Sequence, residues 1–214
     1  MPSADAAALD AVTVDAFGTL LRLEDPTERL RLAFAARGIE RRPEEIRAAF
    51  RAEAAYYRPR TLQGRDAESL DTLRRESVQV FLGAAEVELD AAEFVPAFMD
   101  AVVFQLVDGA VAALDRLRGA GLTLACVANW DISLHEHLRR LDVHSRFAAV
   151  VTSAETAAEK PDPVIFLRAL DVLGVPPHRT LHIGDEDVDR DGARGAGLAF
   201  EPAPLATLPE RLGL

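Results

Sequence analysis

Apolar and polar positions follow two different patterns along this chain. A short apolar run near the N-terminus ends at a turn marked by Gly18, as expected for a buried strand. Helical spacing then extends from Pro26 to Phe104 without a strand pattern, and Pro26 and Pro43 each open a helix beside acidic residues. The predicted helices there are Pro26–Gly38, one beginning at Pro43, Ser69–Leu82 and Ala91–Phe104.

Strand and helix patterns alternate in the second half of the chain, which predicts a parallel sheet with helices on both faces. The helical stretch before it interrupts this α/β pattern, so we predict an all-α domain inserted after the first strand. We assign residues 1–22 and 105–214 to the sheet domain and residues 23–104 to the insertion. The predicted strands are Ala11–Val14, Leu122–Ala128, Phe147–Thr152, Thr180–Ile183 and Leu198–Phe200; the remaining helices are Gly109–Gly119, Leu134–Leu141, Pro163–Leu173 and Asp189–Gly197.

Composition narrows the classes of partner. A formal net charge of −11 argues against nucleic acid and against anionic membrane surfaces. The longest apolar runs are far shorter than a membrane span, and the N-terminus lacks the basic-then-apolar order of a secretory leader. Cys126 is the single cysteine, so no internal disulfide can form, and we expect a cytoplasmic protein. Lys160 is the single lysine among 24 cationic residues, which leaves one candidate for any chemistry that needs an amine.

Four polar side chains follow the predicted strands or the loops after them. They are Asp15, Asn129, Lys160 and Asp185. Ligands of open parallel sheets bind beyond the carboxyl ends of the strands. The sequence therefore predicts a site at this edge of the sheet.

Each of these residues can be interpreted as a functional group or as an ordinary structural feature. Asp15, at a strand end before Gly18 and Thr19, can attack an electrophilic phosphorus or carbon, although an Asp before a turn is common. Asp185, with further acids close behind it, can hold Mg²⁺ or form a solvated acidic loop. Lys160 lies between prolines on a stiff loop, where its charge can hold Asp15 deprotonated.

Asn129, which follows the most apolar strand, can orient a substrate oxygen or simply mark a turn. His182 lies inside a predicted strand and is expected to be a core histidine with hydrogen-bond partners. The segment Tyr56-Tyr57-Arg58-Pro59-Arg60 could recognise a phosphorylated or carboxylated substrate; an amphipathic helix end with extended arginines is the simpler interpretation.

Together and in this order, the motifs resemble the haloacid dehalogenase superfamily. They are Asp-x-x-Gly-Thr-Leu from Asp15, a helical insertion, Asn129, Glu-Lys-Pro-Asp-Pro around Lys160, and His-Ile-Gly-Asp ending at Asp185 with Asp189 four residues later. The resemblance implies a Rossmann-like core with a helical cap. It also implies Asp15 as nucleophile, Lys160 as its charge partner, and Mg²⁺ held by Asp15, the Phe17 backbone carbonyl, Asp185 and Asp189. Phe17, Thr19 and Asn129 would line the substrate.

Two positions depart from the phosphatases of that superfamily. Phe17 stands where phosphatases carry a second Asp that serves as general acid and base, and Ala128 stands where Ser or Thr usually contacts the phosphoryl group. The aromatic residue resembles the 2-haloacid dehalogenase branch. That branch lacks the acidic pair, however, and has a Tyr where this chain has Phe166.

We therefore expect a hydrolase, and three functions stay open. A Mg²⁺-dependent and slow phosphatase of a small phosphorylated metabolite is favoured. The alternatives are a dehalogenase-type carbon–halogen hydrolase and a non-catalytic binding protein. The sequence leaves the substrate and the oligomeric state open.

Overall fold

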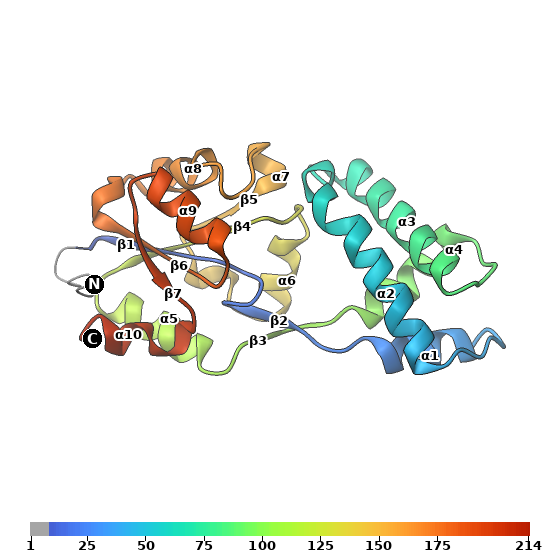
Figure 1. Ribbon diagram of the computed structural model, residues 1–214. Coiled ribbons are helices and arrows are strands. Elements are labelled where there is room, and N and C mark those ends of the chain that lie inside the picture. The colour runs from blue at the N-terminus through green and yellow to red at the C-terminus, as the bar shows by residue number, and fades with distance from the viewer. Residues whose placement is uncertain (1–8) are drawn as a thin grey trace. The chain divides into compact units, whose positions relative to one another are not determined.

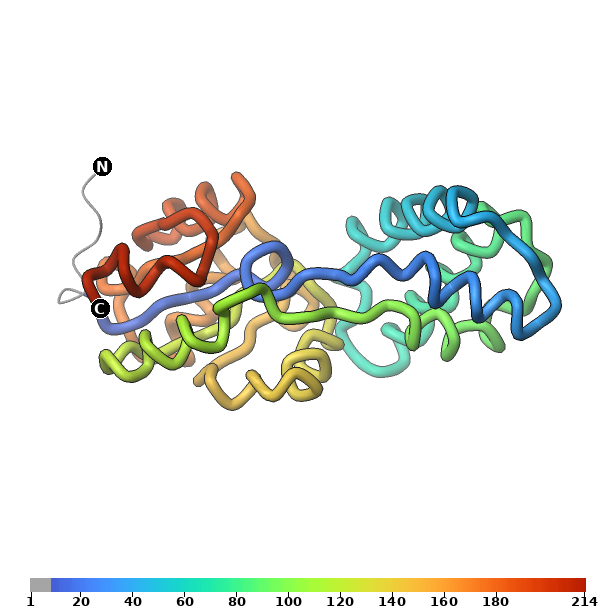
Figure 2. Tube along the Cα trace, turned by 90° about the horizontal axis from the view of Figure 1, so that it is seen from below, coloured from blue at the N-terminus to red at the C-terminus, as the bar shows by residue number. Residues whose placement is uncertain are grey.

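The structure is a computed structural model that describes residues 9–214. The chain divides into two compact units: a sheet unit, formed by Met1–Arg22 with Gln105–Leu214, and a helical unit, Leu23–Phe104. Residues 1–8 of the predicted range 1–22 lie outside the described residues. Figure 1 shows the elements of both units, and Figure 2 traces the two passages of the chain between them. No helix in residues 9–214 has the length and apolar character that a membrane crossing requires.

The sheet unit is built on five parallel strands in the order β5-β4-β1-β6-β7. Their bounds are β1 (Ala11–Val14), β4 (Thr123–Ala128), β5 (Ala149–Thr152), β6 (Thr180–Gly184) and β7 (Ala199–Pro202). All four residues of β1 are buried, because it is the central strand, paired with β4 and β6, and helices cover both faces of the sheet. A strand buried on both faces shows a continuous apolar run rather than alternation. The predicted α/β fold class and its five strands are confirmed.

Helices cover both faces of this sheet. Apolar side chains of α8 and α9 pack with β4 and β5 in one buried cluster, and Figure 1 shows α5 and α10 on the opposite side of the strands. The helices of the sheet unit are α5 (Ala110–Gly119), α6 (Leu134–Arg140), α7 (Ser153–Thr156), α8 (Val164–Leu173), α9 (Asp187–Gly195) and α10 (Leu208–Arg211), with single 3₁₀ turns at η3 (His144–Arg146), η4 (Pro177–Arg179) and η5 (Leu205–Thr207).

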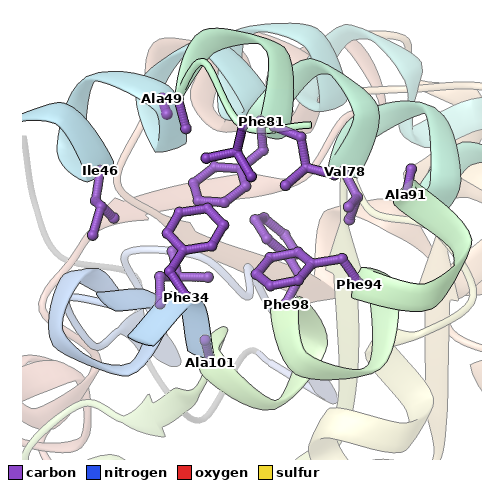
Figure 3. Packing of buried hydrophobic residues seen from close by; sticks show 13 residues of the cluster. Phe34, Ile46, Ala49, Val78, Phe81, Ala91, Phe94, Phe98 and Ala101 are labelled. Atoms are coloured by element: carbon purple, nitrogen blue, oxygen red, sulfur yellow. The ribbon is translucent and has the colours of Figure 1, made fainter. Parts of the chain in front are cut away.

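The helical unit has its own core of aromatic side chains. Its elements are α1 (Thr27–Ala35), α2 (Pro43–Tyr57), η2 (Arg58–Gln63), α3 (Ala67–Ala84) and α4 (Ala91–Ala101). The Asp66 side chain caps α3 by accepting a hydrogen bond from the Ser69 amide at 2.8 Å. Phe34 stacks on Phe81 and on Phe94, with ring centroids 5.6 and 5.1 Å apart, as Figure 3 shows. These buried rings join three helices into one unit.

The segment predicted as helix up to Phe104, without a strand, is in part wrong. Helix α4 ends at Ala101, and Phe104 begins β3 (Phe104–Leu106), which forms a two-stranded sheet with β2 (Leu21–Leu23). Strands of three residues are too short to show a period of two, and this pairing joins residues more than eighty positions apart. Neither feature is visible in the local pattern.

Candidate active site

Asp15 stands at the end of the central strand. Its amide still donates to the Ile183 carbonyl of β6, at 2.9 Å, so the sheet fixes its position. The chain then turns at Gly18, which has φ +89°, and a Cβ at Gly18 would lie 2.1 Å from Oδ2 of Asp185. Only glycine allows both this conformation and this approach. The turn also brings the Thr19 hydroxyl to Asp185 Oδ1, to which it donates at 3.3 Å.

Lys160 is buried and reaches two carboxylates. Its ammonium donates to Asp15 Oδ1 and to Asp189 Oδ1, the latter at 2.5 Å. Asn129 fixes the loop that carries it: the Lys160 amide donates to Asn129 Oδ1 at 2.7 Å, and Asn129 Nδ2 donates to the Lys160 carbonyl at 3.0 Å. In the structure, both polar atoms of the Asn129 side chain therefore serve to position Lys160. Contact of Asn129 with a substrate oxygen stays a prediction.

Three carboxylates meet at this site. Asp15, Asp185 and Asp189 each offer an oxygen within 4.8 Å of the others. Lys160 supplies one positive charge among these three carboxyl groups, so a further cation would be needed to balance them when all three are ionised. Carboxylate oxygens are the donors that Mg²⁺ prefers. The donor set therefore fits a hard divalent cation.

The three acids are not equally available to such a cation. Asp189 Oδ1 accepts from Lys160 and from His182 Nε2, the latter at 3.2 Å, and Asp189 Oδ2 accepts from the Glu186 amide at 3.1 Å. Asp185 is exposed and accepts a hydrogen bond from the Thr19 hydroxyl. The oxygens of Asp185 and Asp15 are accordingly the more open ones.

Burial dominates the electrostatics of the site. It raises the pKa of Asp15 to about 7, with further help from the charge of Asp189 and against the pull of Lys160. The pKa of Asp185 is also raised, by burial and by Asp189. Burial opposes the charged form of Asp189 too, but the His182 hydrogen bond and the Lys160 charge hold its pKa well below the usual range. Asp189 is thus the carboxylate that stays charged beside Lys160.

Two residues next to the site were not expected there from the sequence. The sequence predicts that His182 is a core histidine and indicates no role for Thr13. Both are fully buried, and Thr13 Oγ1 lies 2.9 Å from His182 Nδ1 while His182 Nε2 faces Asp189. Burial lowers the pKa of His182 to about 4, so the ring is neutral at pH 7. No local signal reveals this contact, because it depends on the register of β1 against β6.

Two aromatic side chains stand beside Asp15 and Asn129. Phe17 is 39% exposed, and its ring centroid lies 6.4 Å from that of Trp130. Trp130 is held by its amide, which donates to Ser153 Oγ at 3.1 Å. Position 17 therefore offers an apolar ring in place of a carboxyl group.

The aromatic and arginine residues of the helical unit contact one another. Tyr56 donates its hydroxyl hydrogen to Glu76 at 3.1 Å, and Arg60 donates to the Tyr56 carbonyl at 2.7 Å. The Arg60 guanidinium also lies 3.9 Å from the centre of the Tyr56 ring. These contacts favour a packed helix end, and recognition of a substrate by this segment stays a prediction.

Comparisons with known proteins agree on the family of this chain. A model described as "Hydrolase: haloacid dehalogenase-like hydrolase" matches residues 9–197. The human haloacid dehalogenase-like hydrolase domain-containing protein 3 is 30% identical over 200 residues, which are 87% of this chain and 78% of that protein. A glyceraldehyde 3-phosphate phosphatase from Methanopyrus kandleri is 39% identical over 90 residues, covering 41% of this chain and 39% of the phosphatase.

A solved structure shares the fold at lower identity. The L-2-haloacid dehalogenase from Xanthobacter autotrophicus superposes with a TM-score of 0.65 at 24% identity, over 90% of this chain and 76% of the dehalogenase. The alignments with the frog, bovine and mouse proteins of the same name as the human relative cover less than half of those proteins. The matched proteins include a phosphatase and a dehalogenase, so the similarity alone does not identify the reaction.

Proposed function

This chain belongs to the haloacid dehalogenase-like hydrolase family and is a hydrolase, and we propose that it hydrolyses a small phosphorylated metabolite with Asp15 as nucleophile and Mg²⁺ as cofactor. The observation that carries this proposal is the group of three carboxylates around one buried ammonium. A site for carbon–halogen cleavage has no need of such an excess of acids. The phosphatase relative agrees with the proposal. The substrate is a small molecule, and we expect the reaction to take place in the cytoplasm.

Asp15 and Asp185 would hold the magnesium ion, together with the Phe17 backbone carbonyl. We assign Asp189 to Lys160 instead, because its oxygens already accept hydrogen bonds from Lys160, His182 and Glu186. The bound ion would supply positive charge to the phosphoryl oxygens. It would also stabilise the carboxylate form of Asp15, whose pKa burial raises to about 7 in its absence.

Asp15 carries out the first half of the proposed reaction. One of its oxygens attacks phosphorus, the bond from phosphorus to the leaving oxygen breaks, and the product is an aspartyl phosphate. Lys160 is held against Asp15 Oδ1, where its ammonium favours the carboxylate form and attracts the incoming anion. In the second half, water attacks the phosphorus and releases both Asp15 and inorganic phosphate.

Phe17 makes both halves slow. A phenyl ring cannot protonate the leaving oxygen or accept a proton from the attacking water. General acid–base assistance is typically worth about 10²–10⁴-fold in rate. We therefore propose a preference for substrates whose leaving group departs without a proton.

Carbon–halogen hydrolysis is the second candidate, and Phe17 is the observation that favours it. A halide leaves without protonation, and the exposed Phe17 ring beside Trp130 offers an apolar wall for a haloacid. Release of halide from 2-haloacids without added metal would support it. In that reaction Asp15 would attack carbon, so an Asp15→Asn change would abolish it equally. A binding role without catalysis, the third alternative, would hold only if no substrate of either class were turned over.

The deciding experiment measures nitrophenolate release from p-nitrophenyl phosphate. The assay compares the wild-type chain with Asp15→Asn, each with Mg²⁺ and with EDTA. An Asp187→Asn variant is the matched control, because Asp187 is an exposed acid at the start of α9 that pairs with Arg190. We expect sustained Mg²⁺-dependent release in the wild type and the control, and none in Asp15→Asn.

Other outcomes of this assay distinguish the alternatives. A burst of about one equivalent would mean that Asp15 attacks but that the intermediate is not hydrolysed. Release that is equal in the wild type and in Asp15→Asn would refute the nucleophile. If no variant releases nitrophenolate and the wild type releases halide from 2-haloacids, carbon–halogen hydrolysis would replace the phosphatase proposal.

A further inference from the structure

His182 lies where it can act on the site only through other residues. It is fully buried in β6, with the Phe166 ring edge-on at a centroid distance of 4.8 Å. On its other side, Thr13 of β1 is its register partner. A side chain enclosed in this way cannot contact a substrate. Its influence must pass through the hydrogen bonds of its two ring nitrogens.

The partners of the ring determine which nitrogen carries the proton. Asp189 is a charged carboxylate and can only accept, so His182 Nε2, at 3.2 Å, must donate to it. Nδ1 is then an acceptor, and the Thr13 hydroxyl at 2.9 Å donates to it. The other acceptor near that hydroxyl, the Leu181 carbonyl, is farther away at 3.5 Å. Thr13 thus favours the tautomer that can bond to Asp189.

We propose that Thr13 and His182 form a positioning relay: Thr13, by donating to Nδ1, stabilises the Nε2–H tautomer of His182, which orients Asp189 and thereby holds the Lys160 ammonium against Asp15. The functional part of this inference rests on the proposed role of Asp15 as nucleophile. Its structural part, the position of Lys160, does not.

The two oxygens of Asp189 have different hydrogen-bond partners. Oδ1 is shared by the His182 and Lys160 donors, and the Glu186 amide bonds to Oδ2. A Cβ on Gly184 would lie 2.3 Å from the Asp189 Cγ, so the carboxyl group packs directly on the backbone. Without the His182 donor, Lys160 is the only side chain that donates to Oδ1 among the contacts described above. The Asp189 and Lys160 side chains can then move together. The ammonium is then no longer fixed relative to Asp15.

Loss of the relay should impair the chemical step more than substrate binding. Lys160 acts on the Asp15 carboxylate that attacks, whereas the His182 and Asp189 side chains are themselves buried. Partners that orient the groups of a catalytic site typically change activity by about 10–100-fold when they are removed. We therefore expect kcat to fall by about that factor while KM stays nearly constant.

The kinetic test uses three variants with p-nitrophenyl phosphate and Mg²⁺. His182→Leu removes the donor, and His182→Gln keeps an N–H near the Nε2 position. Thr13→Val keeps the shape of the side chain and removes the hydroxyl. We expect kcat to fall in His182→Leu and in Thr13→Val, to recover in His182→Gln, and to be insensitive to Thr13→Val when His182→Gln is present. Equal loss in the leucine and glutamine variants would overturn the proposal.

A second test needs no activity. Lys160 is the only lysine of the chain, so labelling lysine with ¹⁵N at Nζ gives one side-chain ammonium signal without assignment. We expect His182→Leu to shift or broaden this signal and His182→Gln to restore it. In the wild type, ¹⁵N spectra of the histidines should show His182 protonated at Nε2. An unchanged Lys160 signal in His182→Leu would overturn the relay, even if the wild type turned over no phosphate ester.

Discussion

Glu53 of the helical unit is a buried acid whose replacement by glutamine should stabilise the protein in a pH-dependent way. It lies on α2 and is 7% exposed. Burial raises its pKa from 4.5 to about 7, while the nearby Ser77 hydroxyl and the Arg58 charge only partly oppose the shift. Tyr56 on α2 and Glu76 on α3 bond to each other.

The size and sign of the effect follow from linkage. Below pH 4.5 the carboxyl group is protonated in both the folded and the unfolded chain, so the substitution is nearly neutral. As the pH rises toward 7, the unfolded chain releases the proton more readily, and the folded wild type loses stability. One unit of pKa corresponds to about 1.4 kcal/mol, so a shift of about 2.5 units gives about 3 kcal/mol at pH 8. Glu53→Gln should recover most of this lost stability, because glutamine carries no charge at any pH.

Urea unfolding of the wild type and the variant between pH 4 and pH 8 measures the difference. Both tyrosines, Tyr56 and Tyr57, lie in the helical unit, and the single tryptophan, Trp130, lies in the sheet unit. Tyrosine absorbance and tryptophan fluorescence therefore follow the two units separately. Glu76→Gln, an exposed acid on α3, is the matched control and should change little at any pH. A stability difference that is constant with pH, or no gain at pH 8, would refute the burial argument.

Three further outcomes are expected. Gly18→Ala would place a Cβ 2.1 Å from Asp185 Oδ2 at φ +89°. The substitution should lower the free energy of unfolding in urea by about 1–3 kcal/mol and weaken Mg²⁺ binding measured by calorimetry. An alanine variant with wild-type values for both would contradict the close approach. Phe17→Asp supplies the missing carboxyl group and should raise phenyl phosphate turnover by about 10²-fold, and that of p-nitrophenyl phosphate much less. Equal gains for both esters, or a similar gain in Phe17→Asn, would remove the acid–base explanation. Burial raises the pKa of the Cys126 thiol, so a disulfide reagent at pH 8 should react with one equivalent in urea and with almost none in the native protein.

Much of the fold was predictable because its strands and helices follow from local patterns of apolar residues. The buried strand before Asp15 and the alternating strands and helices after residue 109 follow from apolar runs of the right length. The observed strands Thr123–Ala128 and Ala149–Thr152 begin one and two residues later than predicted, since apolar character does not mark the first ladder hydrogen bond. The pair β2 and β3 was missed because it has no local signal.

The carboxyl ends of parallel strands lie at one edge of the sheet, so the sequence could also indicate that Asp15, Asn129, Lys160 and Asp185 converge. The structure brings Asp15, Lys160 and Asp185 into one cluster, with Asn129 bonded to the Lys160 backbone. Their order along the chain was enough for this, because strand direction fixes where each strand ends.

Only the tertiary structure decided what each of these groups does to its neighbours. Asn129 bonds to the Lys160 backbone, Asp189 stays charged beside Lys160, and Thr13 reaches His182 across two strands in register. Glu53 looks like any acid of an amphipathic helix until its burial is known. A hydrogen bond needs two groups within about 3 Å, and a pKa depends on the water and charges around the group. Both are properties of chain segments far apart in sequence, so they arise only when the fold brings those segments together.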